Sequence, residues 1–265
     1  MELVDRGSGP PLVLIPGIQG RWEYMAPAID ALARHFRVVT FPLCGERSSG
    51  LPFDPARGLD DYADQVASAL ATMGLQRAAI CGVSFGGLVA IRFAATHAAS
   101  TSALVLVSTP GPGWHLRPRH ELYAQLPWLL GPLFLAESPW RLRAEMKAAF
   151  PDSGERWSFR RGLLRTLVSA PLSLSNMAAR AQLMSGIDLR EDCARITAPT
   201  LVVTGEPALD HVVPAEGSSA YARLIASARS AVIDRTGHLG SVTRPDVFAA
   251  LVRDFATHGW RDAVA

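Results

Sequence analysis

Six short apolar runs constrain the fold of this chain more than any other feature of its sequence. Each holds four or five residues, mostly apolar at consecutive positions, and glycine or proline follows within a few residues: 12–15, 37–41, 78–81, 103–107, 200–204 and 230–233. A strand with one exposed face alternates apolar and polar residues, whereas a strand of a parallel sheet is buried on both faces and carries a continuous apolar run. The runs therefore predict a parallel sheet that is covered on both faces.

Segments with helical spacing lie between these runs. Apolar residues line one side of a helix if the segments are helical: 25–35, 59–73, 85–96, 217–227 and 245–258. Alternation of strands and helices is typical of an open sheet with crossover helices. The sequence thus predicts an α/β fold, in which helices flank a mostly parallel open sheet.

The region 112–185 interrupts this alternation. It contains no strand candidate, prolines divide it into helical segments, and four of the six tryptophans lie in it. Its ten basic and five acidic residues give it a net charge of +5, although the whole chain carries only +2. We therefore predict a basic helical cap at 112–185, inserted into a single core domain that is formed by 1–111 and 186–265.

The composition excludes several other classes of protein. With 49% hydrophobic and only 19% charged residues, the chain has enough apolar surface to bury and is not disordered. Its near-balanced charge argues against a protein that mainly coats nucleic acid, and no apolar run approaches the ~20 residues of a membrane-spanning helix. We see no signal peptide, so a cytoplasmic location is the default expectation. Cys44, Cys81 and Cys193 are too widely spaced for a disulfide framework or a thiolate zinc site, and we expect them to be buried.

The segment 81–87 contains a Gly-x-Ser-x-Gly motif around Ser84. Its glycines permit a tight turn from strand to helix, which presents the serine hydroxyl at the edge of the sheet. A strand candidate precedes the motif and a helical segment follows it, as such a turn requires. We therefore predict that Ser84 is a nucleophile rather than an incidental serine in a glycine-rich turn.

A serine hydroxyl becomes an effective nucleophile only when a base takes its proton, and that base is usually a histidine oriented by a carboxylate. His238 follows the last predicted strand and lies at the C-terminal edge of the sheet, where open α/β folds bind their ligands. Asp210 lies on the loop after the strand at 200–204, and Glu206 on the same loop is the alternative acid. His211 adjoins Asp210 and is the closest rival for the role of base.

Acyl transfer also requires backbone N–H groups that stabilise the negative charge developing on the carbonyl oxygen. We expect one from Phe85, directly after Ser84, and a second from the loop 16–20 that follows the first predicted strand. In this loop Ile18 is the first choice and Gln19 the second. The loop lacks the Lys-Ser/Thr pair of a nucleotide-binding loop, so we discount phosphate binding.

Together these motifs resemble the α/β-hydrolase superfamily, specifically its cap-bearing serine hydrolases. The order Ser84, Asp210, His238 along the chain matches the family order. The resemblance extends from Leu12 to the last helical segment and rests mainly on three motifs: Gly-Val-Ser-Phe-Gly-Gly at 82–87, Gly-Glu-x-x-x-Asp-His-Val-Val-Pro at 205–214, and the Gly-His pair at 237–238 that Arg-Pro-Asp follows at 244–246.

The resemblance also accounts for the inserted region, because family members commonly carry a lid between the sixth and seventh strands of the core, where 112–185 falls. Two motifs differ from the family pattern. Pro16-Gly17 stands where the family usually has His-Gly, and 41–48 keeps only part of an Asp-x-x-Gly-x-Gly-x-Ser motif. Neither difference touches Ser84, Asp210 or His238.

The resemblance implies acyl transfer through an acyl-enzyme on Ser84, with no metal and no organic cofactor. A serine at this position argues against the epoxide hydrolases and haloalkane dehalogenases of the superfamily, which use a carboxylate nucleophile. We expect a hydrolase for carboxylic esters of small to medium apolar molecules. A lactonase or a carbon–carbon bond hydrolase with the same triad is an alternative, and a slow-turnover small-molecule sensor is an alternative of another class.

The cap composition bears on the substrate. Its tryptophan, leucine and proline residues predict an apolar substrate tunnel, although packing of the cap on the core explains them equally well. Its arginines suggest steering of an anionic substrate or an acidic carrier protein, with a solvated helix face as the commoner alternative. We expect a small-molecule substrate and neither nucleic acid nor a membrane as partner, while the oligomeric state is not readable from the sequence.

Overall fold

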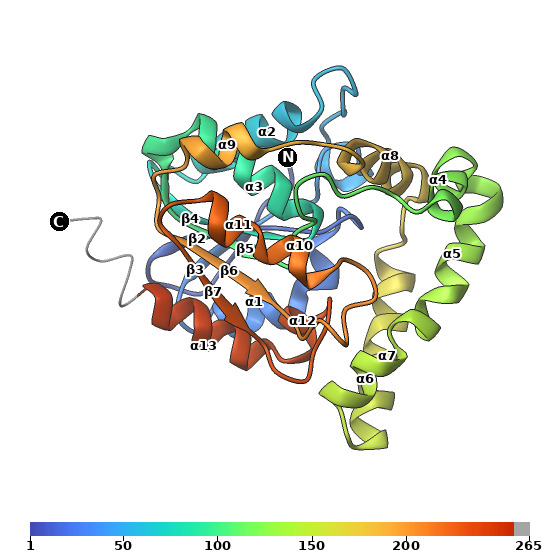
Figure 1. The fold of residues 1–265 in the computed structure, drawn as a ribbon. Coiled ribbons are helices and arrows are strands. Elements are labelled where there is room, and N and C mark those ends of the chain that lie inside the picture. The colour runs from blue at the N-terminus through green and yellow to red at the C-terminus, as the bar shows by residue number, and fades with distance from the viewer. Residues whose placement is uncertain (257–265) are drawn as a thin grey trace.

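Six parallel strands and one antiparallel edge strand form the sheet in the computed structural model, which describes residues 1–256 (Figure 1). The strands are β1 (Val4–Arg6), β2 (Pro11–Ile15), β3 (Arg37–Thr40), β4 (Ala78–Val83), β5 (Thr101–Val107), β6 (Thr200–Thr204) and β7 (Ala228–Val232). Their order across the sheet is β1-β3-β2-β4-β5-β6-β7, and only β1 runs antiparallel to its neighbour. The predicted fold class is confirmed.

The structure departs from the predicted strands at both edges of the sheet and at the bounds of two central strands. β4 ends at Val83, two residues beyond the predicted 78–81, and β5 begins at Thr101, two residues before the predicted 103–107. No apolar run marks β1, because its three residues Val-Asp-Arg include two charged side chains. The last strand is predicted at 230–233, whereas β7 begins two residues earlier. An edge strand has a neighbour on one side only, and most of β7 is partly or fully exposed. No continuous apolar run therefore marks its first residues.

Alternate residues of the central strands point into two separate hydrophobic clusters. In β2, Leu12 and Leu14 belong to one cluster, and Val13 and Ile15 belong to the other. The first cluster is covered by α1 (Ala26–Leu32) and α13 (Pro245–Phe255), and the second by α2 (Leu59–Thr72), α3 (Phe85–Thr96), α9 (Arg190–Arg195) and α11 (Tyr221–Leu224). Helices thus lie on both faces of the sheet, as the apolar runs predict.

The helices of the core agree with the predicted segments in most places. The predicted helix 217–227 is instead two short helices, α10 (Ala215–Ser219) and α11. The helix predicted at 245–258 begins at Pro245, and its last two positions lie outside the described residues. Short elements that periodicity does not detect complete the core: α12 (Gly240–Thr243) and the 3-10 helices η1 (Trp22–Met25), η2 (Arg47–Ser49) and η3 (Ala98–Ser100).

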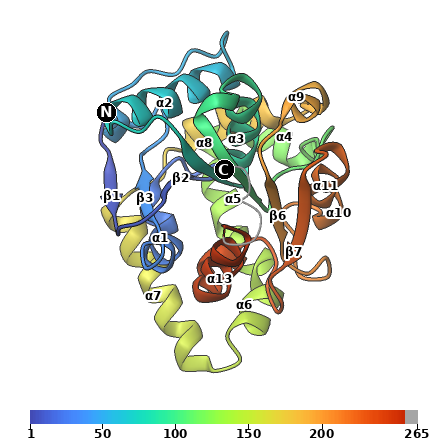
Figure 2. The same cartoon turned by 90° about the vertical axis from the view of Figure 1, so that its left-hand side faces the viewer.

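A helical insertion follows β5 and extends along one side of the core, coloured green to yellow in Figure 1. It comprises α4 (Pro118–Gln125), α5 (Pro127–Arg141), α6 (Arg143–Ala149), α7 (Ser153–Ser169) and α8 (Leu174–Met184). We call these five helices the cap. It contacts the core through α8 on α3, α6 on α12 and α7 on η1, and Figure 2 shows α6 and α7 reaching beyond the sheet. The division into 1–111, 112–185 and 186–265 stays a prediction.

Two details of the cap differ from the sequence-based expectations. Pro132 and Pro139 lie inside α5 rather than ending it. Trp128, Trp140 and Trp157 are 78%, 76% and 56% exposed, so these residues face solvent and do not line an enclosed tunnel. Among residues 1–256, no helix has both the length and the apolar character needed to cross a membrane. The three cysteines are free and buried, as expected.

Candidate active site

Ser84 occupies a sharp turn between β4 and α3. Its backbone has φ 55° and ψ −118°, a conformation that non-glycine residues rarely adopt and that often marks a functional site. Two flanking glycines make the turn possible. A Cβ on Gly82 would lie 2.2 Å from the carbonyl oxygen of Gly86, and one on Gly86 would lie 2.4 Å from that of Ile15. The backbone therefore packs too closely here for any other residue.

The structure brings the three residues of the predicted triad together. His238 Nε2 lies 3.2 Å from Ser84 Oγ, and His238 Nδ1 lies 3.4 Å from Asp210 Oδ2. The three residues follow β4, β6 and β7, so they meet at the C-terminal edge of the parallel strands. Such contacts are often long in an enzyme without substrate and shorten in the reacting complex. The arrangement can carry a proton from the serine to the imidazole.

The Asp210 carboxylate is buried and oriented by its own loop. Its Oδ1 accepts hydrogen bonds from the N–H groups of Val212 and Val213, both at 2.9 Å, which leaves Oδ2 for His238. Burial alone would raise the pKa of Asp210, but the hydrogen bond and charge interaction with His238 and the two amides lower it below its ordinary value. The group stays ionised and can stabilise an imidazolium.

The structure also distinguishes the predicted base and acid from the alternatives on the Asp210 loop. His211 is exposed, and the histidine that contacts Asp210 is His238. Glu206, the alternative acid, accepts a hydrogen bond from the backbone N–H of Arg235 at 2.6 Å. It thus holds the loop that leads to His238.

The two segments predicted to supply oxyanion-stabilising amides flank the serine. Phe85 is the first residue of α3 and is fully buried. In the other segment, Gly20 N–H donates to the Gly17 carbonyl at 2.9 Å and closes a tight turn. A Cβ on Gly17 would lie 3.5 Å from the Cβ of Ser84, so this turn passes beside the nucleophile. The donor roles of Ile18 and Phe85, and of Gln19 as the alternative, remain predictions.

A buried arginine of the cap holds this second segment, and the sequence analysis missed its role. Arg180 on α8 is 1% exposed and forms an ion pair with Glu46 at 2.8 Å. Its guanidinium also donates to the carbonyls of Ile18 and Cys44, each at 3.1 Å, and to the Tyr62 hydroxyl at 3.3 Å. The cap is therefore bonded to the loop that carries a predicted oxyanion donor.

A second charged residue of the cap lies on the opposite side of the site and was also missed. Glu145 on α6 is fully buried, and its Oε1 accepts a hydrogen bond from Leu239 N–H at 2.7 Å. Leu239 directly follows His238. In the sequence Ala-Glu-Met-Lys-Ala-Ala nothing distinguishes this glutamate from one on a solvated helix face, so no sequence signal could have found it.

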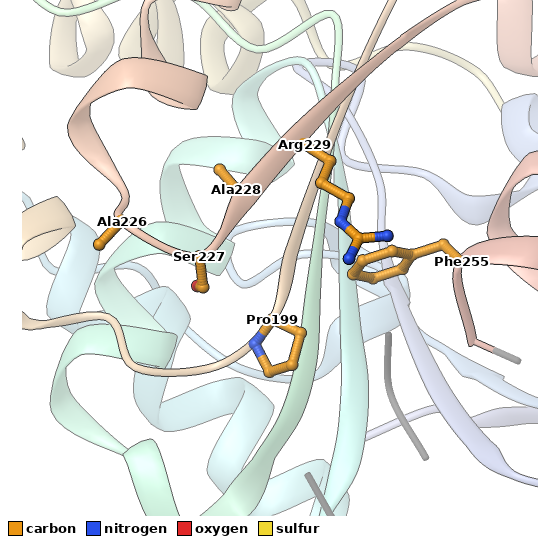
Figure 3. A pocket seen from close by; sticks show the side chains of 6 residues that line it. All are labelled: Pro199, Ala226, Ser227, Ala228, Arg229 and Phe255. Carbon is orange, nitrogen blue, oxygen red and sulfur yellow. The ribbon is translucent and has the colours of Figure 1, made fainter. Parts of the chain in front are cut away.

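The described part of the chain has no candidate metal site, and it has a pocket away from the triad. No group of three or more His, Cys, Asp or Glu side chains in residues 1–256 is arranged to hold a metal ion. A pocket lined by Pro199, Arg229 and Phe255 lies where β6 and β7 begin (Figure 3). Asp210 and His238 follow the other ends of these strands, so this pocket is remote from the triad.

Known proteins resemble this chain in sequence and in fold. The protein provisionally named carbamate hydrolase RutD from Yersinia enterocolitica is 25% identical over 92% of this chain and 86% of its own length. The structure of the enol-lactonase from Burkholderia xenovorans LB400 superposes with a TM-score of 0.78 at 24% identity, covering 97% of this chain and 96% of that one. A thermophilic esterase from Thermogutta terrifontis gives a TM-score of 0.75 at 23% identity, covering 97% and 92%. The sequence profile of the Alpha/beta hydrolase family matches residues 12–251, and the chain belongs to this family.

Proposed function

We propose that this chain is a serine hydrolase that cleaves carboxylic esters of small to medium apolar molecules. The observation that carries the proposal is the chain of contacts from Ser84 through His238 to Asp210, on a serine whose strained backbone lies in the turn at the end of β4. This arrangement activates a hydroxyl for attack on a carbonyl carbon.

The roles of the residues follow from the contacts. Ser84 Oγ bonds to the carbonyl carbon while His238 Nε2 takes its proton, and the ionised Asp210 stabilises the imidazolium. We assign the stabilisation of the oxyanion to the backbone N–H groups of Ile18 and Phe85. The tetrahedral intermediate then expels the alcohol, which receives the proton from His238. Water then attacks the acyl-enzyme and gives its proton to His238. The second tetrahedral intermediate releases the acid, and His238 returns the proton to Ser84 Oγ.

Carbamates are the second candidate substrates, because relatives that span 92% of this chain bear the provisional name carbamate hydrolase. A carbamate carbonyl is attacked by the same triad in the same order of steps. The two candidates differ in reactivity, since the carbamate nitrogen donates electrons to the carbonyl carbon and slows attack. The relative rates on an ester and a carbamate with the same leaving group therefore distinguish the two candidate functions.

The test compares turnover of a short-chain aryl ester, the matching aryl carbamate, a lactone and a β-diketone. We expect multiple turnovers on the ester, none with Ser84→Ala, and a loss of several orders of magnitude in kcat with His238→Ala. His211→Ala, which removes the neighbouring exposed histidine, is the matched control and should retain activity. A single burst without turnover on every substrate would contradict the proposal and favour a slow-turnover sensor.

A further inference from the structure

Glu145 is a buried carboxylate with no arginine or lysine partner among residues 1–256. It is fully buried, and none of the ion pairs formed by the described residues includes it. Its Oε2 is buried without a hydrogen-bond partner among the described residues. Burying a carboxylate in this way is costly unless something in its surroundings favours the charge. The burial of this glutamate is therefore better explained by a functional role than by a contribution to stability.

The groups that favour its charge all belong to the His238 loop. Leu239 N–H donates to Oε1 at 2.7 Å, and the nearby Gly237 amide also favours the charged form of the carboxylate. Burial raises the pKa of Glu145, while these two amides and the charge of His238 act in the opposite direction. The carboxylate thus contacts the main chain on both sides of the predicted catalytic base.

Few other titratable groups face this carboxylate. Asp210 acts on it and opposes its charge. The helices packed against α6 are α12 and α5. The segment Gly-Ser-Val-Thr of α12 has no titratable side chain. On α5, Glu137 is paired with Arg119, and Arg141 donates to the carbonyl of Phe134.

We propose that Glu145 is a positioning residue through which the cap controls His238. Its carboxylate fixes the backbone at 237–239, and its negative charge favours the imidazolium that forms when Ser84 attacks. Since Glu145 lies on α6, this support is present only while the cap is docked on α12. Docking of the cap on the core is thereby coupled to activation of the base. This inference rests on the proposed function, because it requires that His238 be the base.

The test uses two readouts on the full chain: the rate at which a fluorophosphonate labels Ser84, and kcat/KM for a short-chain aryl ester across pH. Labelling depends on the activated serine but not on substrate fit. Glu145→Gln keeps the size of the side chain and removes its charge. We expect it to lower both rates by between about 10-fold and 100-fold, with KM near that of the wild type, because a misplaced catalytic group costs rates of this order.

The pH dependence distinguishes positioning of the base from mere support of the cap. Without the neighbouring negative charge, the imidazole stays neutral to lower pH, so the acidic limb of kcat/KM moves to lower pH in Glu145→Gln. Glu145→Asp keeps the charge on a shorter side chain, and we expect an intermediate rate with the limb of the wild type. Lys147→Gln changes an exposed charge on the same helix and should alter neither readout.

Two results would overturn the inference. One is wild-type labelling by Glu145→Gln. The other is a loss of rate that follows the loss of folded protein in thermal denaturation, while the acidic limb stays in place. If Glu145→Gln fails to fold, Glu145→Asp decides, since a wild-type rate in that variant excludes a positioning role. Failure of the proposed function is distinct: the wild-type chain would then not be labelled, or Ser84→Ala would be labelled equally.

Discussion

Replacing Arg180 with methionine should strongly destabilise this protein and impair its site. Arg180 and Glu46 are 1% and 4% exposed, so the mutation leaves a buried carboxylate without its cation. The remaining donor to that carboxylate oxygen is the amide of Asn176 at 3.1 Å. Methionine is close to arginine in length and fills most of the space, so loss of packing contributes little.

The expected magnitude follows from the burial of the pair. Breaking a buried ion pair by removing one partner costs about 3–5 kcal/mol of the free energy of unfolding, because the other charge stays desolvated. For a domain of this size, that corresponds to a fall in Tm of about 10 °C. Replacing both charges, as in Arg180→Met with Glu46→Gln, removes the uncompensated carboxylate and should restore most of the loss.

The assay is a double-mutant cycle by urea and thermal denaturation, with activity on an aryl ester measured in parallel. Since Arg180 also holds the carbonyl of Ile18, we expect kcat to fall in the single variant while KM changes less. A loss below about 1 kcal/mol in Arg180→Met would refute the reasoning, since that is the size of an ordinary substitution. So would a double variant whose loss equals the sum of the two single losses.

Three further predictions concern the turn, the acid and the thiols. Gly86→Ala places a Cβ 2.4 Å from a backbone oxygen, so we expect phosphonate labelling of the serine to fall about 100-fold or more. The pKa of Asp210 is lowered in the folded state, so its ionised carboxylate should stabilise the fold fully above the pKa of the unfolded state. This stabilisation should disappear as pH falls below about 4. The measurement is the difference in free energy of unfolding between the wild type and Asp210→Asn across pH. Burial raises the pKa of Cys44 to about 12, and the other two cysteines are also buried. A thiol reagent at mildly alkaline pH should therefore label three cysteines only after unfolding, and rapid reaction of the native protein would contradict this.

Local patterns in the sequence were enough to predict the central sheet, the serine turn and the family. Buried parallel strands carry continuous apolar runs, and a Gly-x-Ser-x-Gly turn is recognisable once a strand precedes it and a helix follows. The choice of Asp210 and His238 over Glu206 and His211 used only their positions after predicted strands, and the structure brings the chosen pair into contact with each other. Elements without an apolar run, such as β1 and the start of β7, escaped prediction.

The part that only the tertiary structure decided is what the cap does to the core. Arg180 and Glu145 are far along the chain from the groups they bind, Ile18 and Leu239. In the sequence both are charged residues on helices, and such residues usually face water. Burial of a charge depends on which surfaces meet, and that is settled by long-range packing rather than by local composition. The sequence alone therefore determined the central strands, the serine turn and the order of the predicted triad residues along the chain. Only the tertiary structure shows that two buried side chains, Arg180 and Glu145, bond the cap to both sides of the site.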